Sequence, residues 1–94
     1  MKYSDFLRNS KFLGGGDGSS LENAIIIKVD KTMDGVSLEY DYVNKLYGTK
    51  NVDWKFGLKS VGHIGDKTYD ILWVVLKNGK KKSIYFDITQ FFGK

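Results

Sequence analysis

The spacing of hydrophobic residues predicts one helix and the first strand of a sheet. Residues 24–29 (AIIIKV) are β-branched and nearly continuously apolar, which predicts a short strand buried on both faces. Helical spacing follows over residues 36–47, and Gly48 is a suitable residue to end that helix. The side chains predicted to face the core are Val36, Tyr40, Val43 and Tyr47. We expect Thr32 or Asp34 to cap the start of this helix.

The rest of the chain alternates between strand patterns and turn signals. Residues 54–63, 69–77 and 81–88 read as strands, separated by the hairpin dipeptides Gly65-Asp66 and Asn78-Gly79. The expected fold is therefore α+β with chain order β-α-β-β-β. It consists of a three-stranded antiparallel meander, one further strand and one helix packed on one sheet face. The strand at residues 24–29 should lie parallel to an edge of the meander, because the middle strand already has two neighbours.

Two-residue turns at both dipeptides would set the register of the meander. In that register one face is apolar throughout and should lie against the helix: Phe56, Leu58, Ile71, Trp73, Val75, Ile84, Phe86 and Ile88. The other face carries an apolar strip that would stay open: Leu72, Val74, Leu76 and Tyr85. N-terminal residues, the Phe91-Phe92 tail or a second subunit could cover this strip. We take these six residues as a candidate interaction surface.

The same register places Asp70 directly opposite Asp87, and like charges across a ladder are destabilising. Lys59, a backbone donor, a shared proton or a bound cation could compensate. The pair is therefore a structural network, a candidate cation or ligand site to which Asp17 and Glu39 could contribute, or a catalytic pair. Glu39 itself is expected to pair with a lysine or a loop amide rather than act as a base.

The glycine loop, GGGDGSSLENAIII over residues 14–27, suggests phosphate or cation binding but lacks the known motifs. No lysine follows the last glycine, the loop precedes a strand, and acidic residues are missing at EF-hand offsets. Ser19 and Glu22 instead have capping-box spacing, and Asp17-Gly18 suits a turn with positive φ at the glycine. A structural hinge and an anion-binding nest of amides both fit.

Composition limits the remaining possibilities. The 94 residues suit a single domain at 14–94, preceded by an arm or short helix at 1–13. The chain has no cysteine and one histidine, which excludes disulfides, thiolate metal sites and multi-histidine zinc sites, and no cofactor is expected. No apolar run approaches the roughly 20 residues of a membrane span, and no signal peptide is evident. We therefore expect a cytoplasmic protein with no membrane contact.

Charge offers one further candidate surface. The net charge is +4, and four lysines surround the second hairpin turn: Lys77, Lys80, Lys81 and Lys82. Such a tip could meet phosphates. However, Arg8 is the only arginine, which argues against specific phosphate or base readout, so nucleic acid is the less favoured partner.

Four segments, "GGGDGSSLENAIII", "GVSLEYDYVNKLYG", "YDILWVVLKNG" and "IYFDITQFFGK", resemble a small family of bacterial domains of unknown function. The resemblance covers about residues 14–94 and implies no activity. It implies that seven residues belong to the family pattern: Asp17, Glu22, Glu39, Asp70, Asp87, Phe91 and Phe92. Some resembling proteins look secreted or lipid-anchored, whereas this chain shows neither a signal peptide nor a cysteine for lipid attachment.

Three functional hypotheses follow. The first is a non-enzymatic interaction or structural module with a protein partner or a second copy of itself, because aromatics reach 15% and no catalytic constellation is present. The second is nucleic-acid or acidic-surface binding through the lysine tip. The third is a cation- or small-ligand-dependent function at the aspartate pair.

Overall fold

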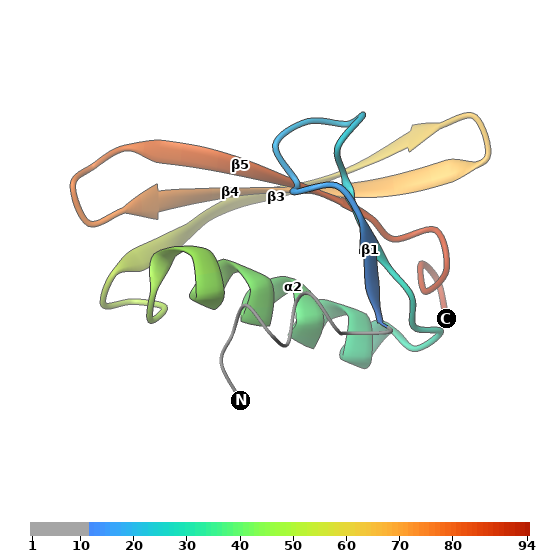
Figure 1. The fold of residues 1–94 in the computed structure, drawn as a ribbon, viewed down its shortest axis with the longest axis horizontal. Coiled ribbons are helices and arrows are strands. Elements are labelled where there is room, and N and C mark those ends of the chain that lie inside the picture. The colour runs from blue at the N-terminus through green and yellow to red at the C-terminus, as the bar shows by residue number, and fades with distance from the viewer. Residues whose placement is uncertain (1–11) are drawn as a thin grey trace.

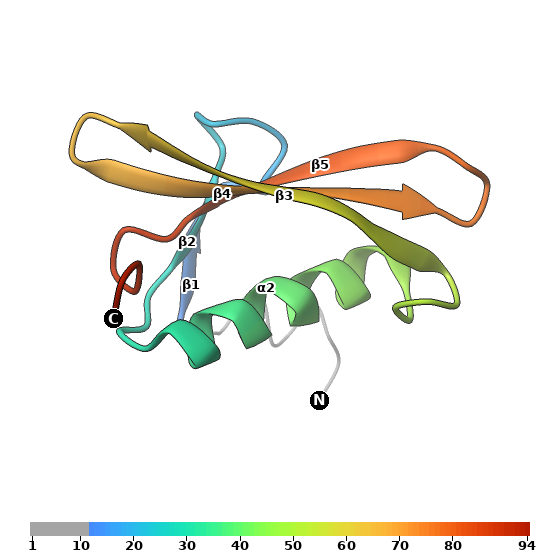
Figure 2. The same ribbon diagram turned by 180° about the vertical axis from the view of Figure 1, so that it is seen from behind.

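A computed structural model describes residues 12–94, which form one helix and a five-stranded mixed sheet. The elements are β1 (Leu13–Gly15), β2 (Ile25–Ile27), α2 (Thr32–Tyr47), β3 (Trp54–Ile64), β4 (Lys67–Leu76) and β5 (Lys81–Asp87). The strands lie in the order β1-β2-β5-β4-β3, and α2 runs beneath one face of the sheet (Figures 1 and 2). The expected α+β class with one helix packed on a sheet is confirmed. The expected N-terminal helix lies outside the described residues.

The first strand, β1, was not predicted, so the chain order is β-β-α-β-β-β. It pairs antiparallel with β2, and Gly14 and Gly15 lie opposite Ile26 and Ile25. Glycines are poor strand formers, but here the neighbouring chain comes too close for a side chain. A Cβ on Gly15 would lie 2.5 Å from the carbonyl oxygen of Ala24. On its other side β2 pairs parallel with β5, an edge of the meander, as expected.

The second hairpin turn differs from the prediction and shifts β5 by one residue. Asp70 pairs with Phe86, not with Asp87. The amide of Leu76 donates to the carbonyl of Lys80 at 2.8 Å, so three residues form the loop, and Gly79 has φ of 87°. Three-residue hairpins commonly place a glycine in this left-handed conformation. Asn78-Gly79 therefore marked the hairpin correctly but gave the wrong loop length.

This one-residue shift corrects the assignment of the sheet faces. Leu72 and Val74 lie opposite Ile84 and Lys82. Both Leu72 and Val74 are fully buried between the sheet and α2. They belong to the core and not to an open strip. The opposite, open face of β4 and β5 instead carries half-buried Ile71, Trp73, Val75 and Tyr85.

The first hairpin keeps the predicted register from Ile64–Lys67 up to Leu58–Trp73. A bulge at Gly57 then shifts the pairing, so that Phe56 lies opposite Val74. A bulge adds one residue to a strand and reverses the sides beyond it. Phe56 and Leu58 therefore lie on opposite faces, although their spacing predicted the same face.

The core-facing side of α2 is rotated from the predicted stripe. Gly35, Glu39, Tyr42 and Val43 are buried, while the other predicted core positions Val36, Tyr40 and Tyr47 are only half-buried. Neither predicted cap forms, because Lys31 is the N-cap and makes no side-chain cap bond. Gly48 does end the helix, with φ of 102° and its amide donating to Asn44.

Candidate interaction surface

Glu39, Lys59 and Asp70 form a charged cluster between α2 and the sheet. Lys59 Nζ lies 2.9 Å from Glu39 Oε1 and 3.3 Å from Asp70 Oδ2. Lys59 and Asp70 point to the helix side because β3 and β4 alternate, and Glu39 reaches them from α2. Lys59 contacts Asp70, which was one of the alternatives offered, although there is no facing Asp87 charge for it to offset. The lysine partner expected for Glu39 is confirmed.

The surroundings of Glu39 favour its protonated, neutral form. Burial, followed by the nearby carboxyl group of Asp70, raises the pKa of Glu39 to about 9, against the opposing effect of Lys59. Burial lowers the pKa of Lys59, but the two acids outweigh it and the net shift is upward. One ammonium neutralises one carboxylate, and a second buried carboxylate would be uncompensated. Glu39, whose side chain is fully buried, is therefore the neutral partner.

Asp87 lies apart from Asp70 and ends β5. Its Oδ1 accepts hydrogen bonds from the amide of Thr89 at 3.0 Å and from the Thr89 hydroxyl at 2.6 Å. Its Oδ2 lies 3.9 Å from Lys67 Nζ. The aspartate pair predicted from sequence does not form, and Asp87 stabilises the turn that follows β5.

Asp17 organises the glycine loop. Its carboxylate accepts a hydrogen bond from the backbone amide of Ser19 at 3.0 Å. Hydrogen bonds from Ser19 lower the pKa of Asp17. Gly18 has the predicted positive φ, at 83°. The Ser20 hydroxyl accepts a hydrogen bond from the backbone amide of Asn23. The predicted capping box between Ser19 and Glu22 is therefore wrong. The tip of the loop projects beyond the sheet on the side away from α2 (Figure 1), while the carbonyl oxygen of Asp17 accepts a hydrogen bond from the Tyr42 hydroxyl of α2 at 3.0 Å.

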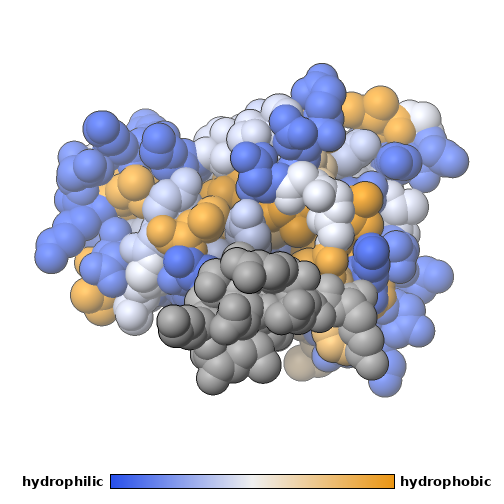
Figure 3. All heavy atoms as spheres, in the orientation of Figure 1, coloured by the Kyte–Doolittle hydropathy of each residue, from blue (hydrophilic) through white to orange (hydrophobic). Residues whose placement is uncertain are grey.

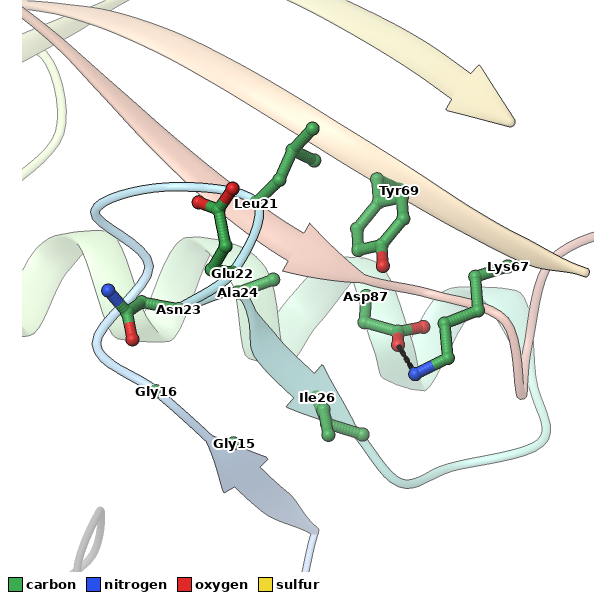
Figure 4. A pocket seen from close by; sticks show the side chains of 10 residues that line it. All are labelled: Gly15, Gly16, Leu21, Glu22, Asn23, Ala24, Ile26, Lys67, Tyr69 and Asp87. Atoms are coloured by element: carbon green, nitrogen blue, oxygen red, sulfur yellow. Dashed lines mark ion pairs between the residues drawn. The ribbon is translucent and has the colours of Figure 1, made fainter. Parts of the chain in front are cut away.

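A shallow pocket of about 400 Å³ lies where this loop meets the start of β4 and the end of β5. Figure 4 shows Lys67, Tyr69 and Asp87 together at one end, with Glu22 and Asn23 on the loop at the other. The polar groups do not converge on one point, and Lys67 and Asp87 already face each other. This arrangement gives no defined ligand geometry.

The four lysines of the β4–β5 turn are all exposed. Lys81 pairs with Val75 and Lys82 with Val74, so these two lysines point to opposite faces of the sheet. Figure 3 shows hydrophilic side chains at this end of the molecule and a hydrophobic area near the β3–β4 turn at the other end. The lysines surround the tip without forming one basic face.

The remaining predicted surface residues divide between core and surface. Phe91 is buried against Gly35 of α2, whereas Phe92 is 46% exposed and meets the His63 ring edge-on. Leu76 and Tyr85 are half-buried. Phe91 therefore covers the helix side of the sheet and does not cover the open face.

Sequence reasoning missed the edge strand β3, which carries several exposed apolar side chains. Four of its apolar side chains are exposed: Phe56 (43%), Leu58 (61%), Val61 (46%) and Ile64 (55%). β3 has eleven residues, ends the sheet and pairs only with β4 among the described strands. The sequence gives one sign of this surface, because the strand contains only three titratable side chains: Lys55, Lys59 and His63. That the strand lies at an edge, however, depends on the strand order.

Edge strands are usually protected against pairing with other chains by charged side chains, especially lysine. Lys59 is in the middle of β3, yet its ammonium is held by Glu39 and Asp70 beneath the sheet. The stretch from Val61 to Ile64 contains no lysine, arginine or acid. We define the β3 edge as residues 58–64, whose outer side pairs with no strand among residues 12–94 and carries few protective charges.

Other kinds of site receive no support in the described chain. Across residues 12–94, no three histidine, cysteine or acidic side chains gather as metal ligands. In the same range, no helix has the length and apolarity that crossing a bilayer requires. Comparison of the chain with protein-family models, curated proteins and solved structures gave no significant match. The resemblance to a bacterial domain family therefore stays a prediction.

Proposed function

We propose that this protein is a non-enzymatic binding module that takes an extended protein segment onto the β3 edge. The observation that supports this best is the exposure of four apolar side chains along a long edge strand that, in the described part of the chain, pairs with β4 alone. An extended segment can add to such an edge through main-chain hydrogen bonds, while its side chains contact those of the edge.

The open face of the sheet extends this surface. Leu58 lies opposite Trp73, and Ile71 lies opposite Tyr85, so aromatic and apolar side chains continue inward from the edge. Tyrosine and tryptophan are enriched at protein interfaces because they bury large areas with little loss of conformational freedom. A segment paired with β3 would contact Leu58 first and could then reach Trp73.

The test uses two variants matched in exposure. Val61→Lys places a charge at the middle of the β3 edge, and Leu46→Lys places one on α2, where the leucine is also 46% exposed. Extended peptides selected from a displayed library against the wild-type chain should lose binding to the Val61→Lys variant by at least about tenfold. The Leu46→Lys variant should bind them as the wild type does.

Hydrogen exchange gives a second readout. A bound peptide should slow exchange of the amides of residues 59–63 and leave the amides at the β4–β5 turn unchanged. Peptides that bind both lysine variants equally, or that protect another element, would show that the β3 edge is not the binding surface.

A further inference from the structure

The β3 edge is complementary to itself. This inference rests on the proposed function and names the partner: we propose that a second copy of the chain pairs antiparallel with β3 about Val61. The two five-stranded sheets would then join across a twofold axis perpendicular to the sheet. Both helices would lie on the same side, and the two open faces would become one surface.

The main chain of β3 is arranged for this pairing. Ile64 and Lys67 flank the two-residue turn to β4, and such a flanking pair is hydrogen-bonded in a hairpin. Hydrogen-bonded and non-hydrogen-bonded pairs alternate along an antiparallel ladder. Lys59, Val61 and His63 therefore direct their backbone N–H and C=O groups away from β4. An axis at Val61 brings these groups opposite the same groups of the second copy.

The side chains favour the same register. With the axis at Val61, this residue meets its own copy on the helix side. On the open face Leu58 meets Ile64 of the second copy, and the symmetry repeats that apolar pair. Moving the axis by one residue would place Leu58 opposite Gly62 or Asp66 and lose both Leu–Ile pairs.

Charges at the ends of the paired strands are complementary. Lys55 and Asp66 are both exposed, one near the start of β3 and the other in the turn that follows it. Antiparallel pairing about Val61 brings Lys55 of each copy toward Asp66 of the other. The ammonium of Lys59 is already paired with Glu39 and Asp70, so it does not add an unpaired charge to the centre of the interface.

The test exchanges the Leu–Ile pair for an ion pair. Leu58→Glu and Ile64→Lys alone each replace both symmetric apolar pairs and should weaken self-association at least about tenfold in analytical ultracentrifugation. The double variant should recover to within about threefold of wild type, because each introduced carboxylate faces an introduced ammonium of the other copy. Within one chain these positions are six residues, about 20 Å, apart, so no pair can form there.

Each outcome decides the question. Circular dichroism should show the same folded spectrum for all four proteins, because Leu58 and Ile64 are exposed. A double variant as weak as the single variants overturns the pairing register, and a wild-type chain that stays monomeric at millimolar concentration overturns self-pairing altogether. Those results leave the peptide experiment with Val61→Lys to decide the proposed function independently.

Discussion

Replacing Glu39 with glutamine tests whether the buried cluster holds a proton at neutral pH. Glutamine keeps the size of the side chain and can donate to Asp70 and accept from Lys59, but it does not titrate. The pKa of Glu39 rises from its ordinary value of 4.5 to about 9 in the folded chain. Between these values the folded chain binds a proton that the unfolded chain has released, so the free energy of unfolding falls as pH rises.

The size of the effect follows from one proton. The slope is at most about 1.4 kcal/mol per pH unit, or about 3 kcal/mol between pH 6 and pH 8. The raised pKa of Lys59 adds stability that is present below its ordinary value of 10.5 and is lost only at higher pH, so it leaves this window flat. The Glu39→Gln variant should match wild type near pH 5 and exceed it increasingly toward pH 8.

Urea unfolding followed by tryptophan fluorescence at pH 6, 7 and 8 measures this difference, because Trp54 is buried in the core. The melting temperature of the wild type should fall relative to the variant by roughly 10 °C or more across this range. Glu22→Gln removes an exposed carboxylate and is the control. Parallel slopes for wild type and Glu39→Gln would mean that Glu39 is ionised beside Lys59, and the assignment of the proton would be wrong.

Three further substitutions test the packing and the turns, each by chemical denaturation. Gly35→Ala should destabilise by about 1–2 kcal/mol although alanine favours helices, because a Cβ would overlap the Phe91 ring; unchanged stability would show that Phe91 can move aside. Trp54→Phe should cost about 2 kcal/mol, because the indole N–H donates to two acceptors at 3.0 and 3.1 Å; a neutral result would show that those bonds add nothing net. Asp87→Asn should lower the free energy of unfolding by about 1–2 kcal/mol, because an amide oxygen accepts weaker hydrogen bonds from Thr89, and adding Ca²⁺ or Mg²⁺ should not change that value. A variant more stable than wild type, or a stability that depends on the cation, would instead support a metal site.

Much of the fold could be predicted because its elements depend on local patterns. The helix ended at Gly48 as expected, and the three meander strands were recognised from alternation and turn dipeptides. β1 was missed because two of its three residues are glycine, which is a poor strand former, so its Leu-Gly-Gly sequence gives no strand pattern. The faces were assigned wrongly because an added turn residue or a bulge residue reverses every later side chain, and neither leaves a clear pattern in one sequence.

The candidate site was harder to predict for the same reason. Asp70 and Asp87 were paired by the wrong register. Lys59 could still be named as a possible partner of Asp70, because the predicted β3–β4 register is correct at these residues, and a lysine or a loop amide was expected for Glu39. The β3 edge could not be predicted, since an edge strand is defined by what lies beside it and the chain gives no local signal of strand order. The side of β3 to which Lys59 points decides whether its charge protects the strand from pairing with another chain. That side is set by the alternation of side chains along β3, and Glu39 on α2 and Asp70 on β4 hold the ammonium there, so the buried cluster and the exposed edge are two consequences of one side-chain orientation.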